Sequence, residues 1–151
     1  MQKREEFENT LQEVLADYQM KRRAGVHSTS ENYLFEDTGL DFDVDTAFIE
    51  CAKTAGVNYV VIDVATATSN DIETIIANWN TPTAYLFKNY GDESAGNIHN
   101  KISFFMKDRE VGICASSDSE PQVAFCGATV TKEKPIRDFN ERQAFSSVIK
   151  L

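Results

Sequence analysis

Carboxylates are the most concentrated of the chemically active side chains in this sequence. Five of them fall within ten residues: Glu36, Asp37, Asp41, Asp43 and Asp45. Clustered carboxylates can bind a divalent cation through their oxygens, or they can present a negatively charged surface to a basic partner. A solvated loop at the start of a helix is a third possibility, because carboxylates stabilise helix N-termini.

The spacing of Asp41, Asp43 and Asp45 matches the first half of a calcium-binding loop. Such a loop needs glycine at its sixth position and a bidentate glutamate at its twelfth. Thr46 and Ala52 occupy these two positions, so we do not expect specific calcium binding.

The negative charge of the chain comes from one segment. The 151 residues carry 24 acids and 15 bases, which gives a net charge of −9. Residues 24–87 contain ten acids and a single base, Lys53, and this difference equals the whole net charge. A strongly acidic chain is poorly suited to the phosphates of nucleic acids, so we expect no direct nucleic-acid binding.

We therefore predict that the acidic segment binds another protein. Two acids further along the chain, in the loop after a predicted strand, extend this hypothesis. The predicted acidic docking face consists of Glu36, Asp37, Asp41, Asp43, Asp45, Asp92 and Glu93.

The cysteines and histidines show no pattern of catalysis or metal binding. Cys51, Cys114 and Cys126 are odd in number and widely spaced, which predicts reduced thiols in a cytoplasmic protein. His27 and His99 have no recognisable catalytic partner, and we expect His99 near the surface of a helix. We also expect no resident metal or cofactor, and no membrane span, because no apolar run approaches 18 residues.

The remaining sequence predicts the elements that position these residues. Apolar residues recur at helical spacing in some segments, and nearly continuous apolar or β-branched runs occur in others. The predicted helices cover residues 4–20, 44–55, 69–79 and 96–107, with Ser69 or Asn70 as the cap of the third. The predicted strands cover residues 32–35, 58–64, 83–87, 109–114, 122–126 and 144–151.

Helices and strands alternate along the chain, and this predicts the α/β class. We expect one domain over residues 1–151: a three-layer sandwich around a mostly parallel sheet of about five strands. An N-terminal helix and a β-hairpin, formed by residues 109–114 and 122–126, complete this architecture.

The order of these elements resembles the α/β core of the AAA+ ATPases, a P-loop NTPase family, and in particular its MoxR-like group. Residues 51–64 are similar to the segment from the first core helix to the second strand. Residues 97–112 are similar to the helix and hairpin after the magnesium-binding strand, and residues 125–129 to the strand that carries the first sensor. The resemblance implies a P-loop NTPase-like fold.

The catalytic positions of that family are not matched. A phosphate loop has the pattern G-x-x-x-x-G-K-[ST], in which lysine contacts the phosphates and the hydroxyl binds magnesium. Only Gly39 fits, while Phe42 replaces the lysine and Asp43 replaces the hydroxyl residue. Val130 stands at the sensor position, and Arg142 is only a loose candidate for an arginine finger.

The third strand should end in Asp-Glu, but residues 87–89 read Phe-Lys-Asn. Phosphoryl transfer depends on all of these parts together. The resemblance therefore implies a degenerate core without catalytic motifs, a pseudo-ATPase. Two other folds stay open: an unrelated α/β sandwich, and a thioredoxin-like fold, suggested by Pro82 before a strand but lacking any CxxC motif.

We expect this chain not to be an enzyme. The favoured function is protein–protein binding as a regulator, decoy or inhibitor, with an AAA+ ATPase or another multi-subunit machine as partner. A phage or mobile-element accessory protein would fit this description. One alternative is a metal-assisted hydrolase using Asp41, Asp43, Asp63 or Asp92, and another is an inhibitor that mimics DNA.

Aromatic residues offer one more candidate contact surface. Trp79, Tyr85, Tyr90, Phe104 and Phe105 could form an exposed patch, although core packing is the favoured role. Phe104 lies off the apolar stripe of its predicted helix, so it becomes a contact residue if it is exposed.

Overall fold

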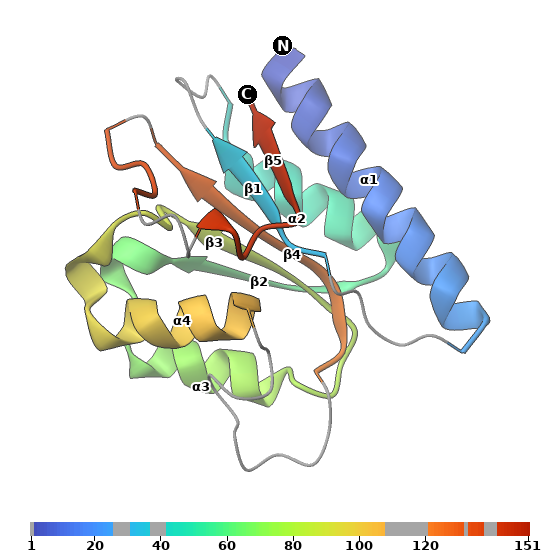
Figure 1. Ribbon diagram of the computed structural model, residues 1–151. Helices are drawn as coiled ribbons and strands as arrows, with labels where there is room; N and C mark the ends of the chain where they lie inside the picture. Colours follow the sequence, from blue (N-terminus) through green and yellow to red (C-terminus); the bar gives the residue numbers. More distant parts are fainter. Residues whose placement is uncertain (1, 26–30, 37–41, 108–120, 132, 138–141) are drawn as a thin grey trace.

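Five parallel strands form a single sheet at the centre of the computed structural model (Figure 1). The structure describes residues 2–25, 31–36, 42–107, 121–131, 133–137 and 142–151. The strands are β1 (Tyr33–Glu36), β2 (Asn58–Asp63), β3 (Thr83–Lys88), β4 (Val123–Val130) and β5 (Ser147–Lys150). Their order across the sheet is β2-β3-β4-β1-β5. The first strand of the predicted hairpin, at residues 109–114, lies outside the described residues.

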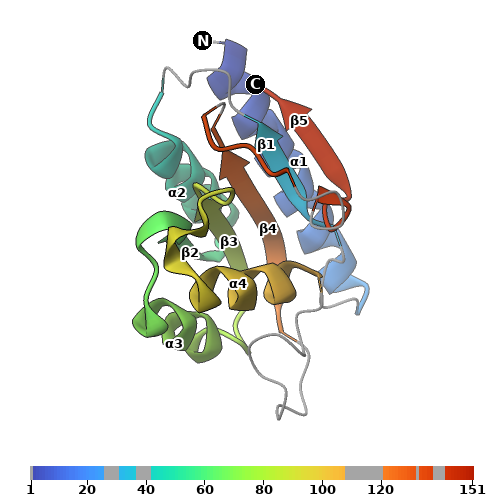
Figure 2. The same ribbon diagram turned by 60° about the vertical axis from the view of Figure 1, so that its left-hand side comes forward.

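Helices cover both faces of the sheet, which confirms the predicted three layers (Figure 2). The helices α1 (Gln2–Arg23) and α2 (Val44–Ala55) pack on one face. The helices α3 (Ser69–Ala77) and α4 (Asn97–Lys107) pack on the other. Single turns of 3₁₀ helix, η1 (Val64–Thr66) and η2 (Glu93–Ala95), follow β2 and β3. Across the described ranges, we find no helix with the length and apolar character needed to span a bilayer.

The central strand β3 shows why its sequence is continuously apolar. Its side chains alternate between the two faces of the sheet, and both faces are covered by helices. Ala84 and Leu86 pack in the cluster formed with α1 and α2, whereas Tyr85 and Phe87 pack in the cluster formed with α3 and α4. All four are fully buried, which explains why the middle of this strand contains no charged side chain.

A β-bulge interrupts this alternation in β4. Thr83 pairs with Val123, but the next residue, Ala84, pairs with Phe125, so Ala124 is the extra residue. As a result, Ala124 and Phe125 both pack in the cluster formed with α1 and α2.

The Phe125 ring lies at the centre of an aromatic group. Its centroid is 5.6 Å from that of Tyr33, 6.4 Å from Phe35 and 6.1 Å from Phe48. Gly127, two residues further along β4, leaves the space that this ring needs. A Cβ atom at Gly127 would lie 2.5 Å from the Phe125 ring.

Local signals set the ends of two helices. Helix α2 ends at Gly56, whose φ of 71° is left-handed and whose N–H reaches the carbonyls of Ala52 and Lys53. Helix α3 is capped by Thr68, one residue earlier than predicted, and Asp71 accepts a 2.8 Å hydrogen bond from the Thr68 N–H. The prediction of Ser69 or Asn70 as the cap was wrong by one position, because the acid that completes the capping box lies three residues after Thr68.

The expectation that His99 lies near the surface was wrong. His99 is buried, and its Nε2 lies 2.9 Å from the Tyr90 carbonyl oxygen. The Tyr90 hydroxyl donates to Ser103 at 3.0 Å. His99, Ile102, Ser103 and Met106 share the buried face of α4, at spacings of three, one and three. The two polar side chains of this face, His99 and Ser103, therefore each have a hydrogen-bond partner in the core.

We predict that Gly127→Ala destabilises the fold by about 1–3 kcal/mol, because the new methyl group overlaps a ring that its neighbours hold in place. Urea unfolding followed by circular dichroism measures this loss. The double variant Gly127→Ala, Phe125→Leu should lose less than the sum of the two single variants, because the smaller side chain removes the overlap. Strict additivity would contradict this explanation.

Candidate functional site

The carboxyl edge of the sheet is the first place to look for a site. In open parallel sheets, ligands bind outside the carboxyl ends of the strands, where the strand order reverses. Here β1 lies between β4 and β5, and the chain leaves β1 through α2 toward β2 at the far edge. The charged residues that end the strands are Glu36, Asp63, Lys88 and Lys150.

The N-terminus of α2, which follows β1, is bound by the chain itself. Asp43 is the N-cap, and its carboxylate accepts hydrogen bonds from the backbone N–H groups of Asp45 at 3.1 Å and Thr46 at 3.4 Å. The Thr46 hydroxyl donates to the same carboxylate at 2.8 Å. This hydroxyl bond, followed by the backbone bonds, lowers the pKa of Asp43. Helix N-termini of this kind bind phosphates in other proteins, but here an internal anion already occupies the amides.

An ion pair connects the same helix to the end of β3. The Lys88 Nζ lies 3.0 Å from Asp45 Oδ2, and these side chains are 27% and 37% exposed. The sequence analysis identified Lys88 only as a departure from the expected Asp-Glu. The structure shows that this lysine neutralises an acid of the predicted docking face.

Two further acids of that face also have basic partners within the chain. Glu36, at the end of β1, pairs with Arg142. Asp92 pairs with Lys134 at 2.8 Å, and the Asp92 side chain is only 14% exposed. The hydrogen bond from Lys134, followed by those from Ser94, lowers the pKa of Asp92 from 3.8 to about 2.

The structure thus places the predicted docking face as follows. Asp43 and Asp45 lie together at the start of α2, whereas Glu36 and Asp92 each contact a different base. Asp37 and Asp41 lie outside the described residues, and the side chain of Glu93 is not described. No local sequence pattern indicates Lys134 as a partner, because 42 residues separate it from Asp92.

The alternative of a clustered-carboxylate metal site finds little support among the described residues. No group of three or more His, Cys, Asp or Glu side chains in the described part of the chain could hold a metal ion. Asp63 accepts hydrogen bonds from the Ala65 N–H and from Asn89 Nδ2, both at 3.0 Å. The Asp63 carboxylate thus links the turn after β2 to Asn89, the residue that follows β3.

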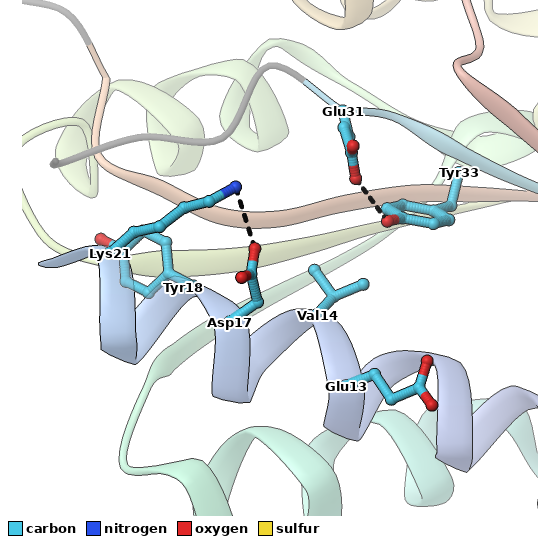
Figure 3. Close-up of a pocket in the computed structure, with 7 residues that line it drawn as sticks. All are labelled: Glu13, Val14, Asp17, Tyr18, Lys21, Glu31 and Tyr33. Atoms are coloured by element: carbon cyan, nitrogen blue, oxygen red, sulfur yellow. Dashed lines mark hydrogen bonds and ion pairs between the residues drawn. The ribbon is translucent and has the colours of Figure 1, made fainter.

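A pocket lies between α1 and the start of β1, at the opposite ends of the strands (Figure 3). Its volume is about 200 Å³, and three carboxylates, two tyrosines, a lysine and a valine line it: Glu13, Asp17, Glu31, Tyr18, Tyr33, Lys21 and Val14. The Tyr33 hydroxyl donates to Glu31 at 2.7 Å, and Lys21 pairs with Asp17 at 2.9 Å. Burial is the largest cause that raises the pKa of Tyr33. The hydrogen bond to Glu31 and the nearby negative charges raise it further. The sequence analysis did not predict this pocket. Lys21 places a positive charge beside its carboxylates.

The two buried thiols agree with the expected reduced cysteines. Cys51 lies in α2 and Cys126 in β4, and neither forms a disulfide. Cys114 and His27 lie outside the described residues.

A parallel sheet in the order β2-β3-β4-β1-β5, between two layers of helices, defines a P-loop NTPase-like α/β fold of the AAA+ type. The solved structures that share it include RuvB from Thermotoga maritima. The R170A variant of RuvB superposes with a TM-score of 0.60 at 16% sequence identity. The structure titled RuvB Holliday junction branch migration motor gives a TM-score of 0.58 at 15% identity.

Each of these superpositions covers 97% of this chain but 44% of the RuvB chain. This chain thus spans less than half the length of the neighbours it matches. Identity this low shows a shared fold and nothing about activity. No protein-family model and no curated protein sequence matches the chain.

We predict that Asp92 titrates with a midpoint near pH 2 in the folded protein. The pKa is lower than in the unfolded chain, so the Asp92–Lys134 pair stabilises the fold above about pH 4 and loses this effect as the pH falls toward 2. Carbon-13 NMR of the carboxyl groups measures the midpoint. Lys134→Ala should move it back toward 3.8, and a wild-type midpoint already near 3.8 would contradict the ion pair.

A second prediction concerns the ion pair between α2 and β3. Lys88→Asp should destabilise the fold by about 1 kcal/mol, because it replaces a partly exposed attraction with a repulsion. The double variant Asp45→Lys, Lys88→Asp restores opposite charges and should be more stable than the two single losses predict. Thermal unfolding of all four proteins measures this coupling, and the absence of coupling would show that the two charges do not interact.

Proposed function

We propose that this chain is a non-catalytic protein with an AAA+-like core that acts by binding another protein. The observation that carries the proposal is the occupied N-terminus of α2. Two backbone amides in the first turn of α2, those of Asp45 and Thr46, are bonded to the Asp43 carboxylate. A phosphate that approached the N-terminus of this helix would compete with this internal anion for them.

The charges around this position support the same conclusion. A working phosphate loop places a lysine at the start of the helix and acids at the end of the third strand. This chain has the opposite arrangement, with Asp43 and Asp45 on the helix and Lys88 on the strand. At about 4 Å the Asp43 carboxylate would repel a phosphate charge by roughly 1 kcal/mol in water and about 4 kcal/mol near a protein surface. Lys88 is paired with Asp45 and offers no carboxylate to a magnesium ion.

A core of this kind fits a regulator, decoy or inhibitor of a multi-subunit machine. It has the shape of an AAA+ core, and a partner that recognises such cores could bind it without nucleotide. An AAA+ ATPase is the partner class we favour. The net charge of −9 predicts that the contact surface of this partner is basic.

The other two functions receive less support from the described residues. A metal-assisted hydrolase needs converging carboxylates, and Asp63 and Asp92 each bind different internal groups. A DNA mimic needs an extended stripe of available acids, whereas Glu36, Asp45 and Asp92 are paired with bases of the same chain.

We predict that the purified chain shows no saturable binding of ATP or ADP up to about 1 mM in the presence of magnesium, which corresponds to less than about 4 kcal/mol of binding free energy. Isothermal titration calorimetry measures this directly, and RuvB serves as the matched positive control. Micromolar, magnesium-dependent binding of ATP would overturn the proposal.

The contact with a partner is tested separately. Proteins retained by the immobilised wild-type chain are compared with those retained by the triple variant Asp37→Lys, Asp41→Lys, Glu93→Lys. Glu36, Asp43, Asp45 and Asp92 are left unchanged because each bonds to another group of the chain, and its replacement would also disturb the fold. Retention of the same proteins by both forms would exclude these three acids as the contact site.

A further inference from the structure

Helix α4 differs in charge from the other helices of the protein. Residues 97–107 include two lysines and no acid, although the whole chain has a net charge of −9. The helices α1, α2 and α3 each contain acids. The surface of α4 is therefore locally positive on an acidic protein.

The outer face of α4 also carries an exposed aromatic side chain. Phe104 is 54% exposed and is the only aromatic residue among the large apolar side chains that are exposed in the described ranges. Lys101 and Lys107, three residues before and after it, are exposed on the same face of the helix. We call these three residues the α4 surface. As the sequence analysis anticipated, Phe104 contributes nothing to the core, which contains Phe105 instead.

The neighbouring helix also carries an exposed apolar side chain. Helices α3 and α4 lie side by side on one face of the sheet (Figures 1 and 2). Both connect adjacent parallel strands, so they run in the same direction. Ile76 lies near the end of α3 and is 40% exposed, while Phe104 lies in the second half of α4.

We propose that the α4 surface, together with Ile76, binds an acidic amphipathic helix of a partner protein. Charge complementarity favours an acidic partner, because the two lysines flank the aromatic anchor. The outer face of a helix offers side chains but no free backbone groups, so the partner must contact it through side chains. An amphipathic helix does this with apolar residues at positions i, i+3, i+4 and i+7.

A second copy of the chain is a poorer occupant. In a symmetric dimer through this face, the lysines of one copy would approach those of the other, and like charges would repel. The inference rests on the proposed function, since it gives a protein-binding chain one defined contact surface. This surface is distinct from the acidic docking face and opposite to it in charge.

The experiment selects partners for this surface from an unbiased source. A phage-displayed library of short helical peptides is selected on the wild-type chain and depleted on Phe104→Ala. The enriched peptides should be acidic, with apolar residues on one helical face. The affinity of the strongest peptide is then measured by fluorescence anisotropy at low and high salt.

We expect Phe104→Ala to weaken that peptide at least about tenfold, as truncation of a central anchor does. Lys101→Glu, Lys107→Glu should weaken it further and reverse its salt dependence, because salt then screens a repulsion in place of an attraction. Met20→Ala and Lys53→Glu, which change an exposed apolar and an exposed basic residue on α1 and α2, are the matched controls and should leave it unchanged. Circular dichroism confirms that each variant is folded.

Three results would overturn the inference. They are a lack of enriched peptides, enriched peptides that are basic, and equal binding to wild type and Phe104→Ala. Analytical ultracentrifugation adds a fourth, since a wild-type dimer that Phe104→Ala dissociates would make this face a self-interface. None of these results bears on nucleotide binding, so the inference can fail while the proposed function stands, and tight ATP binding would leave the peptide result intact.

Discussion

Burial of the parallel sheet on both faces is the constraint on which the rest of this structure depends. Strand β3 has buried side chains toward both layers of helices, and the same holds along the whole of β4. Polar and charged groups are therefore displaced to the ends of the strands and to the outer faces of the helices. This displacement explains why the charged residues Glu36, Asp63 and Lys88 stand at the carboxyl ends of their strands, the edge where a P-loop fold places its ligand.

At that edge the chain satisfies its own charges. An enzyme leaves its helix N-terminus and its cations available, so that a ligand completes their hydrogen bonds and neutralises them. Here Asp43 binds the helix amides, Lys88 binds Asp45 and Arg142 binds Glu36. A site satisfied in this way loses its internal contacts when a ligand enters, and this cost opposes binding.

The sequence predicted the fold where local signals and burial coincide. The helical spacing of apolar residues predicted α2 over residues 44–55, the bounds that the structure shows, and the run of apolar residues after Pro82 predicted β3. Pairings across long separations, such as Asp92 with Lys134, leave no local pattern. The buried His99 was missed because its partner, the Tyr90 carbonyl, belongs to the backbone and has no signature in the side-chain sequence.

Side chains differ in how much free energy they would gain from contact with a partner protein. Groups that already have internal partners gain little from a second partner, because new contacts only replace existing ones. An apolar side chain in water gains from any contact that buries it. Phe104 is such a side chain, and the lysines beside it limit which partners can cover it. Exposed apolar area on a helix of unusual charge is thus a stronger indication of a contact than Glu36, Asp45 and Asp92, whose charges are paired with bases of the same chain.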